Sequence, residues 1–436
     1  MSKRARLRRL LGPTAGLKKA IILTLVGLLC FTLGSSLSFK QVIAPFLDAV
    51  AAQAGRWIKP LFPGEDLEIP LHMLGGLLLF LGLALTFFGL RAFVRHLVET
   101  LNPSMKSGMA DVYLRRQRLS QGPKIVALGG GTGLSTLLRG LKQYSSNITA
   151  IVTVSDDGGS SGRLVQDKGM IPPGDIRNCL VALADAEKAM TDLFQHRFKR
   201  DSGTLSGHSM GNLLLAALAD QAQGDFEKAI EIASDVLAIR GRVVPSTLDR
   251  VRLRAVLEDG DEICGETAIA HAGRRIRRVF LEPASVAPHQ PAIDAIRDAD
   301  LVCIGPGSVF TSVVPNLLVP GIAQALKDCR SPRVYICNVM TQPGESDTFT
   351  ASEHVTSVQV NVEMRIFDYV FVNTGEPSQA AIEKYREVGQ HMVDADVDRI
   401  RAMGFRPVSG NYISESDFVR HDPMRLAKRL MQMVSR

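Results

Sequence analysis

The sequence predicts an α/β fold: a Rossmann-like doubly wound sheet with an inserted β-hairpin, preceded by two transmembrane helices. The apolar run 125–128 leads into a glycine-rich loop and then into helical spacing over 134–141, as in a strand–loop–helix unit. Two long apolar runs ahead of residue 121 predict the membrane helices. Short apolar runs typical of buried parallel strands recur at 148–154, 301–304, 334–338 and 369–373.

Residues 20–39 and 71–90 are the expected membrane spans, since each is long enough to cross a bilayer core of about 30 Å. A signal peptide is the alternative for the first run, and the presence of the second run argues against it. Lys and Arg are concentrated outside the pair, which places both termini in the cytoplasm. We therefore expect a multi-pass protein of the cell membrane, with 1–121 as anchor and connector and 122–436 as a cytoplasmic Rossmann-like domain.

The formal net charge of +7 belongs to the N-terminal segment. Residues 1–121 contain 16 Lys and Arg against 6 Asp and Glu, whereas the remainder contains 35 against 38. The globular part therefore lacks the overall basic excess that collects nucleic acid, and we expect no nucleic-acid partner. The six cysteines form no CxxC pair and no zinc spacing with histidine, which favours free thiols in a reducing compartment.

The loop from Gly129 through Gly130, Gly131, Thr132 and Gly133 is the first candidate ligand site. Its glycines allow a tight turn and close approach of a ligand, and the following helix start is suited to an anion. No Gly-Lys-Ser/Thr closes the loop, so it is not a Walker A motif. As a dinucleotide fingerprint it is imperfect, because Leu134 stands at the third glycine position. The alternative is that the loop is a tight turn between a strand and a helix with no ligand-binding role.

Polar residues after the next strands extend the candidate site. Asp156 and Asp157 end the second strand, where a carboxylate can reach a ribose hydroxyl. Asp175 is expected to cap a helix, and Asn178 lies one turn further on the same side. His208 and Asn212 lie beside glycines at the start of an apolar helix, although a lone histidine in such a place is more often structural.

The second half of the chain repeats this arrangement after an interruption. Residues 251–281 alternate in polarity around Asp259-Gly260, which predicts an inserted hairpin. The strand at 301–304 then leads into a second glycine loop, and a further loop follows the strand at 334–338. Ligands bind outside the carboxyl ends of strands in such sheets. The candidates from this half are Gly305, Gly307, Ser308, Asn338 and, near the C-terminus, Arg420.

Seven motifs in order resemble the bacterial gluconeogenesis factor family, whose superfamily includes 2-phospho-L-lactate transferase. The resemblance covers nearly all of 123–436 and leaves 1–121 outside it. The motifs are GGGTGLS (129–135), VSDDGGSSGRL (154–164), PPGDIRNCL (172–180), GHSMGNLLLAAL (207–218), GPGSVFTSVVPNLLV (305–319), NVMTQPGESD (338–347) and VRHD (419–422).

The resemblance implies a Rossmann-like domain that binds a UDP-sugar such as UDP-N-acetylglucosamine. It further implies a regulator of cell morphogenesis and of peptidoglycan precursor supply during gluconeogenic growth, here tethered to the membrane. By matching motif, Gly130 to Gly133, Asn212, Gly305 to Ser308, Asn338 and Arg420 line that site, and Asp156 and Asp157 match the paired acids of the transferase. We also expect a homo-oligomer.

Catalysis is open at this point. The first alternative is a Mg²⁺-dependent transferase of phosphorus-containing groups, in which Asp156, Asp157 and Asp175 are the catalytic candidates. Asp157 is the candidate metal ligand, because Mg²⁺ takes few carboxylates and adds phosphate oxygens. The second alternative is a nicotinamide-dependent oxidoreductase, which ranks lower because of Leu134. A binding protein without a reaction ranks first, since the motifs offer phosphate and ribose contacts rather than a nucleophile with its base.

Overall fold

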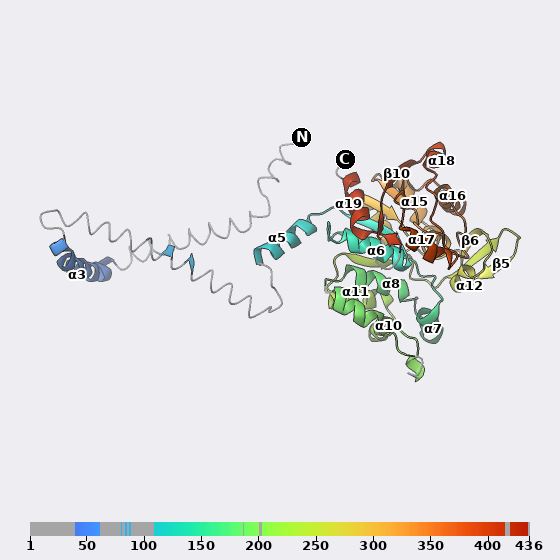
Figure 1. Cartoon of the computed structure of the whole chain (residues 1–436). Coiled ribbons are helices and arrows are strands. Elements are labelled where there is room, and N and C mark those ends of the chain that lie inside the picture. Colours follow the sequence, from blue (N-terminus) through green and yellow to red (C-terminus); the bar gives the residue numbers. More distant parts are fainter. Residues whose placement is uncertain are drawn as a thin grey trace. The chain divides into compact units, whose positions relative to one another are not determined.

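The computed structural model describes residues 40–61, 109–185, 187–199, 203–414 and 419–434, together with a few isolated positions between 80 and 88. The chain divides into two compact units, Met1–Arg118 and Leu119–Arg436 (Figure 1). The described elements of the first unit are α3 (Lys40–Ile58), η1 (Lys59–Leu61) and most of α5 (Met109–Ser120).

The predicted location as a multi-pass membrane protein is contradicted. Within the described residues, no single helix has both the length and the apolar character needed to cross a bilayer. The predicted spans, 20–39 and 71–90, lie outside the described residues except for isolated positions in the second. The sequence of helix α3 contains the charged residues Lys40, Asp48 and Arg56, so α3 does not have the apolar character of a membrane-spanning helix.

One bent pair of helical segments does meet the length and composition criteria. It joins Val309–Leu318 to Ile322–Asp328 at an angle of 80°. Its apolar side chains, including Val313, Leu317 and Ile322, are buried in the core of the second unit. Their apolar character is therefore explained by packing inside the protein.

The second unit is built on a seven-stranded sheet in the order β10-β9-β8-β7-β1-β2-β3, with every neighbouring pair parallel. The chain starts at a central strand, fills one side and returns to fill the other, so the predicted Rossmann-like sheet is confirmed. The strands are β1 (Ile125–Gly129), β2 (Ile148–Val152), β3 (Arg242–Pro245), β7 (Leu301–Ile304), β8 (Arg333–Ile336), β9 (Tyr369–Asn373) and β10 (Arg406–Gly410).

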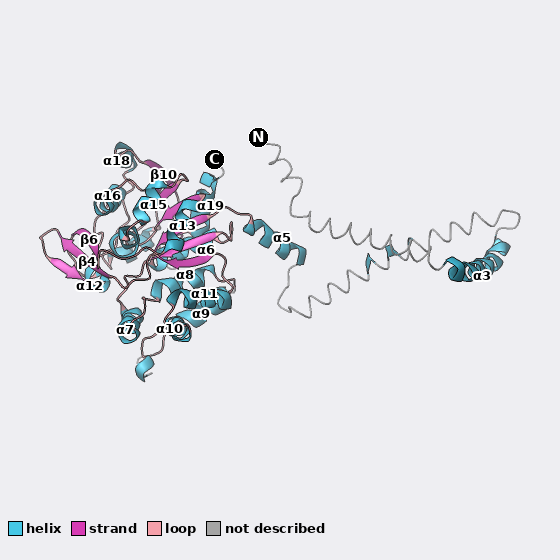
Figure 2. Cartoon of the chain, turned by 180° about the vertical axis from the view of Figure 1, so that it is seen from behind, coloured by secondary structure: helices cyan, strands magenta, loops and turns pink. Residues whose placement is uncertain are grey.

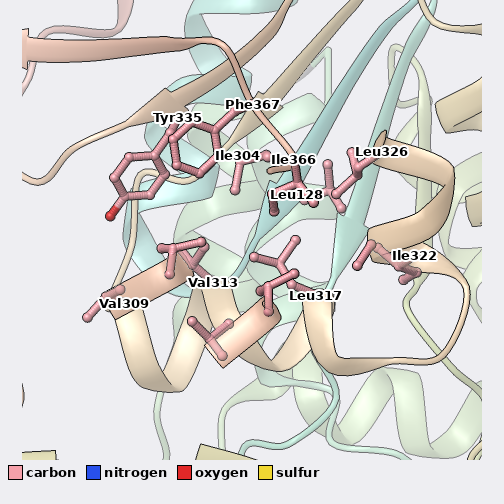
Figure 3. Packing of buried hydrophobic residues seen from close by; sticks show 14 of the residues in the cluster. Leu128, Ile304, Val309, Val313, Leu317, Ile322, Leu326, Tyr335, Ile366 and Phe367 are labelled. Atoms are coloured by element: carbon pink, nitrogen blue, oxygen red, sulfur yellow. The ribbon is translucent and has the colours of Figure 1, made fainter. Parts of the chain in front are cut away.

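The central strands are apolar throughout because both faces of the sheet are covered. In β1, Val126 and Leu128 enter one buried cluster, while Ile125 and Ala127 enter the cluster on the opposite face. Figure 3 shows the first cluster, where Leu128 and Ile304 lie over Val313 and Leu317. Nearby, the rings of Tyr335 and Phe367 stack with centroids 5.2 Å apart.

Helices cover both faces of this sheet (Figure 2). Side chains of α6, α8, α11 and α19 join the cluster on one face, and those of α13, α14, α15 and α16 join the other. The helical segments are α6 (Gly131–Leu141), α7 (Gly159–Lys168), α8 (Gly174–Leu183), α9 (Glu187–Gln195), η2 (Gly203–Leu205), α10 (Met210–Gln221), α11 (Phe226–Leu237), α12 (Glu266–Ala270), α13 (Gln290–Asp298), η3 (Val309–Val313), α14 (Val314–Leu318), α15 (Ile322–Asp328), α16 (Ala351–Val362), α17 (Gln379–Arg386), α18 (Val397–Ala402) and α19 (Pro423–Val434).

The hairpin around Asp259-Gly260 is present and belongs to a larger ribbon. Strands β4 (Arg252–Leu257) and β5 (Glu262–Cys264) pair antiparallel, and β6 (Ile276–Glu282) pairs with the other edge of β4. The short helix α12 follows β5 and closes over the ribbon. A two-stranded sheet of β11 (Ile413–Ser414) and β12 (Arg420–His421) lies near the C-terminus.

Helices α6 and α19 pack closely against each other at Gly140. A Cβ atom at this position would lie 2.7 Å from the Pro423 carbonyl carbon and 2.9 Å from the Ala427 Cβ. We expect Gly140→Ala to lower the free energy of unfolding by about 1–3 kcal/mol, because overpacking must push the helices apart. Denaturant unfolding of the full chain measures this. Gly129→Ala is the control, since its Cβ would make ordinary contacts at 3.5 Å. Equal effects of the two substitutions would contradict the expectation.

Candidate functional site

A cavity of about 630 Å³ opens at the carboxyl ends of the central strands. Three loops that are distant in sequence border it: the glycine loop 130–133 after β1, residues 306–308 after β7, and residues 338–342 after β8. We call this cavity the strand-tip pocket. Of the residues predicted for the site, it contains Gly130, Gly131, Thr132, Gly133, Asp156, Asp175, Gly307, Ser308, Asn338 and Arg420.

The glycine loop and the second loop approach each other more closely than side chains would allow. A Cβ atom at Gly133 would lie 2.8 Å from the Pro306 carbonyl carbon and 3.1 Å from the Gly307 Cα. Gly131 has φ +61°, a conformation that favours glycine. Gly133 therefore brings together the two loops that form the floor of the strand-tip pocket.

Side-chain amides fix the third loop against the second. The Gly307 N–H donates to Asn338 Oδ1 at 3.1 Å, and Gln342 Nε2 donates to Ser308 Oγ at 2.8 Å. Asn338 Nδ2 in turn donates to Gln342 Oε1 at 3.3 Å. These hydrogen bonds join the ends of β7 and β8 into one preformed wall.

The start of α6 faces the pocket with the amides of the glycine loop. Amides in the first turn of a helix have no partner within the helix and attract an anion. Asp175 accepts the Gly131 N–H, so a carboxyl of the protein already occupies part of this position. The amides of Thr132 and Gly133 belong to the same first turn. An anion bound here would therefore lie beside Asp175.

Three carboxyl groups of the pocket have raised pKa values. Burial, followed by the charge of Asp156, raises the pKa of Asp175 to about 7, although the Gly131 N–H and Arg177 act in the opposite direction. Burial is also the main cause that raises the pKa of Asp156. Glu266, which α12 brings to the pocket, has its pKa raised to about 8 by burial and by Asp156 and other acids. Near neutral pH the pocket is thus less negative than its composition indicates.

Asp157 does not line the pocket, although the sequence groups it with Asp156. Its Oδ1 accepts the Thr267 N–H at 2.9 Å and the Thr267 hydroxyl at 2.8 Å. The carboxylate therefore caps α12 and ties the inserted ribbon to the loop after β2. Asp175, in contrast, is not the predicted helix cap: Pro173 holds that position, and Asp175 lies inside the first turn.

Asn178, His208 and Asn212 lie in a polar network behind the pocket rather than in its lining. The buried Arg177 donates from Nη1 to Ser209 Oγ at 2.6 Å and to Asn212 Oδ1 at 2.8 Å, and from Nη2 to Asn178 Oδ1 at 2.9 Å. His208 Nδ1 lies 3.0 Å from Ser160 Oγ. The network positions Arg177 beside the acids of the pocket.

Gly129 and Gly305 also lie behind the lining of the pocket. The Gly129 carbonyl accepts a hydrogen bond from Asn316 Nδ2 at 3.0 Å, and the Gly305 N–H donates to the Leu128 carbonyl at 2.8 Å. Gly305 has φ +80°, which a side chain would strain. These two glycines shape the strand ends that carry the loops.

Several lining residues were not predicted from the sequence. Glu266 comes from the inserted ribbon, and Tyr385, Val388 and Gln390 come from α17 and the segment after it. No local motif marks these residues, because only the tertiary fold brings them to the strand ends. The other unpredicted lining residues are Thr136, Thr153, Ser312, Val339, Met340, Thr341, Gln342, Val419 and His421.

The acids of the pocket fit a metal ion only together with a phosphate ligand. Among the described residues there is no group of three His, Cys, Asp or Glu side chains placed to hold a metal ion. Mg²⁺ commonly takes one or two carboxylates and completes its shell with phosphate oxygens and water. Asp156 and Asp175 face the pocket and suit that role, whereas Asp157 is bonded to Thr267.

Comparison with known proteins shows the family. The family model described as 2-phospho-L-lactate transferase CofD matches residues 125–413. The gluconeogenesis factor of Bacillus subtilis is 46% identical over 317 residues, which cover 72% of this chain and 99% of that protein. A crystal structure of a Bacillus halodurans protein, described as a member of the upf0052 family, has a TM-score of 0.68 and 45% identity over 71% of this chain and 99% of its own.

Similarity also extends beyond the predicted limit of the resemblance. A Nostoc protein is 45% identical over 433 residues, which cover 97% of this chain and 91% of that protein. Such a match includes most of residues 1–121, which the sequence motifs alone left unassigned. The motifs, the parallel sheet and these matches agree, and the chain belongs to the gluconeogenesis factor family.

Proposed function

We propose that the chain binds a UDP-sugar such as UDP-N-acetylglucosamine in the strand-tip pocket and thereby regulates the supply of cell-wall precursors and cell shape during gluconeogenic growth. The observation that carries the proposal is the convergence of three strand-end loops on one pocket at the start of α6. A helix start offers amides to a diphosphate, and the cavity of about 630 Å³ lies in the usual range for small-molecule sites.

The pocket offers separate groups for the phosphate, hydroxyl and apolar parts of a nucleotide sugar. Glycine amides, Ser308 and Arg420 offer donors for phosphate oxygens, while Asp156 and Asn338 offer acceptors or amides for hydroxyl groups. Tyr385 and Val388 supply an apolar wall on the side of α17. A regulator that reports the level of a sugar nucleotide requires binding of this kind and no chemical step.

Arg420→Gln tests the proposal in the full chain. We expect about a tenfold or greater loss of UDP-N-acetylglucosamine affinity in calorimetry, because a charge-assisted contact to phosphate contributes about 1.5–3 kcal/mol. Arg401→Gln is the matched control, since its side chain is 60% exposed on α18 and forms an ion pair with the exposed Asp398. Absence of binding heat for the unchanged chain at millimolar UDP-sugar would refute the proposed function.

A transferase of phosphorus-containing groups is a second candidate. It is favoured by the acids Asp156, Asp175 and Glu266, which lie in the pocket together. Bound Mg²⁺ would supply charge neutralisation at the phosphates, with Asp156 and Asp175 holding it. A Mg²⁺-dependent product formed from a nucleotide and an acceptor, lost in Asp156→Asn, would establish this activity in place of pure binding.

A further inference from the structure

A second cavity lies at the opposite edge of the sheet from the strand-tip pocket. It has a volume of about 340 Å³ and is bordered by the first residues of three neighbouring strands: Arg333 of β8, Tyr369 of β9 and Arg406 of β10. Parallel pairing brings these strand starts to one edge. Arg330 and Arg365 join the cavity from the loops before β8 and β9. We call it the arginine cavity.

Two of its arginines are held in place by aromatic rings. The Arg365 guanidinium lies 4.8 Å from the centroid of the Phe405 ring and donates to the Gly404 carbonyl at 2.8 Å. The Arg406 guanidinium lies 5.6 Å from the Tyr369 ring, and its Nη1 donates to the Tyr369 hydroxyl at 3.1 Å. Stacking leaves the edges of a guanidinium available to an acceptor while it restricts the side chain.

The acidic groups of the protein neutralise only part of the positive charge of these arginines. Asp368 is the one acidic side chain that borders the described cavity, against four arginines. It accepts Arg333 Nη2 at 2.7 Å and Nε at 3.2 Å, and its other oxygen lies 3.8 Å from Arg365 Nε. Arg333 is further bonded to the carbonyls of Leu326 and Lys327. Arg333 is therefore committed to the fold, and Arg330, Arg365 and Arg406 carry the excess charge.

We propose that the arginine cavity is a second anion-binding site, which takes a small phosphorylated metabolite through Arg330, Arg365 and Arg406. Guanidinium groups match phosphate oxygens in pairs, and the preorganised Arg365 and Arg406 lose little freedom on binding. A volume of about 340 Å³ accommodates a compact phosphate ester and is near the lower limit of small-molecule pockets. The concave shape and limited volume favour a compact ligand over an acidic protein segment.

The test uses inorganic pyrophosphate as the probe and calorimetry on the full chain at low, fixed ionic strength. We expect Arg330→Gln/Arg406→Gln to lower pyrophosphate affinity at this site about tenfold or more while UDP-N-acetylglucosamine binding is unchanged. Arg330→Gln alone should give a smaller loss in the same direction. That side chain is exposed and has no hydrogen bond or ion pair with a described residue, so its loss leaves folding unaffected. Arg401→Gln removes the same charge elsewhere and should change nothing.

The outcomes separate this site from the strand-tip pocket. Arg420→Gln should lower the affinity of the strand-tip pocket for pyrophosphate and leave pyrophosphate binding in the arginine cavity unchanged. The proposal would be overturned if Arg330→Gln/Arg406→Gln bound pyrophosphate with the same affinity as the unchanged chain. It would also be overturned if a polyglutamate peptide, and not pyrophosphate, bound in an Arg330-dependent manner, since the site would then dock protein. If the unchanged chain binds pyrophosphate in the arginine cavity but does not bind the UDP-sugar, the proposed function is refuted and this inference stands.

Discussion

Gly133→Ala is expected to reduce the affinity for UDP-N-acetylglucosamine about a hundredfold or more, a loss of about 2.7 kcal/mol in binding free energy. The added Cβ atom would lie 2.8 Å from the Pro306 carbonyl carbon and 3.1 Å from the Gly307 Cα. Both neighbours are backbone atoms, so relief requires the loop 306–308 to move away from the glycine loop. The amides of α6 and the second loop would then no longer face one diphosphate.

Gly129→Ala is the matched control for this prediction. The sequence alone places Gly129 and Gly133 in the same loop, yet a Cβ atom at Gly129 would make its nearest contact at an ordinary 3.5 Å, to Leu134 Cβ. We expect this variant to bind the UDP-sugar as the unchanged chain does. Calorimetry compares the two variants, and circular dichroism verifies that both are folded. Equal losses of affinity would show that the approach of the two loops does not form the site.

Asp175→Asn is expected to tighten UDP-sugar binding at alkaline pH and to flatten its dependence on pH. In the unchanged chain, a diphosphate beside Asp175 favours the protonated carboxyl, whose pKa is raised to about 7 by burial and by Asp156. Above that pH one proton must be taken up on binding, so affinity should fall by up to about tenfold per pH unit. Asparagine keeps the shape and needs no proton. Calorimetry from pH 6 to 9 measures the difference.

The same carboxyl predicts how folding stability depends on pH. Its pKa rises from an ordinary 3.8 to about 7 on folding, so the folded chain retains a proton that the unfolded chain releases. Stability contributed by this group therefore falls as pH rises from about 4 to about 7 and is constant above. Asp175→Asn should raise the free energy of unfolding at pH 8 by about 1–3 kcal/mol, because one pKa unit is worth about 1.4 kcal/mol and pocket water screens part of it.

Asp398→Asn is the control for charge, since Asp398 is 97% exposed on α18. It should leave the pH dependence of binding and of stability unchanged.

The two candidate functions also predict different effects of Asp175→Asn. If Asp175 holds Mg²⁺ for a transferase, Asp175→Asn should weaken Mg²⁺-dependent nucleotide binding at every pH. A weaker UDP-sugar affinity at pH 8 without Mg²⁺ would contradict the proton-linked account.

Much of the sheet could be predicted because its strands have a local signal. β1, β2, β7, β8 and β9 are short apolar runs, and each is followed by a turn rich in glycine, proline or polar residues. The edge strands β3 and β10 were not predicted, and for β10 the reason is physical. β10 has the sequence RPVSG and is only partly buried, so neither apolar character nor β-propensity distinguishes it from a loop.

The candidate site could be predicted only to the level of its loops. The motifs identified the loops at the ends of β1, β7 and β8, and most glycines of the first loop line the pocket. Sequence adjacency could not show that Asp156 faces the pocket while Asp157 caps α12. Nor could it show that Asn212 is engaged with Arg177. Such assignments depend on side-chain direction within a turn and on residues far away in the sequence.

A crystal structure of the chain with UDP-N-acetylglucosamine is the most direct test of the central claim that the strand-tip loops form one diphosphate site. We predict that diphosphate oxygens lie within hydrogen-bond distance of the Thr132 and Gly133 amides, with the ligand also contacting the loop 306–308 and Arg420. A diphosphate bound away from the start of α6, or a sugar nucleotide bound outside the strand-tip pocket, would contradict the account.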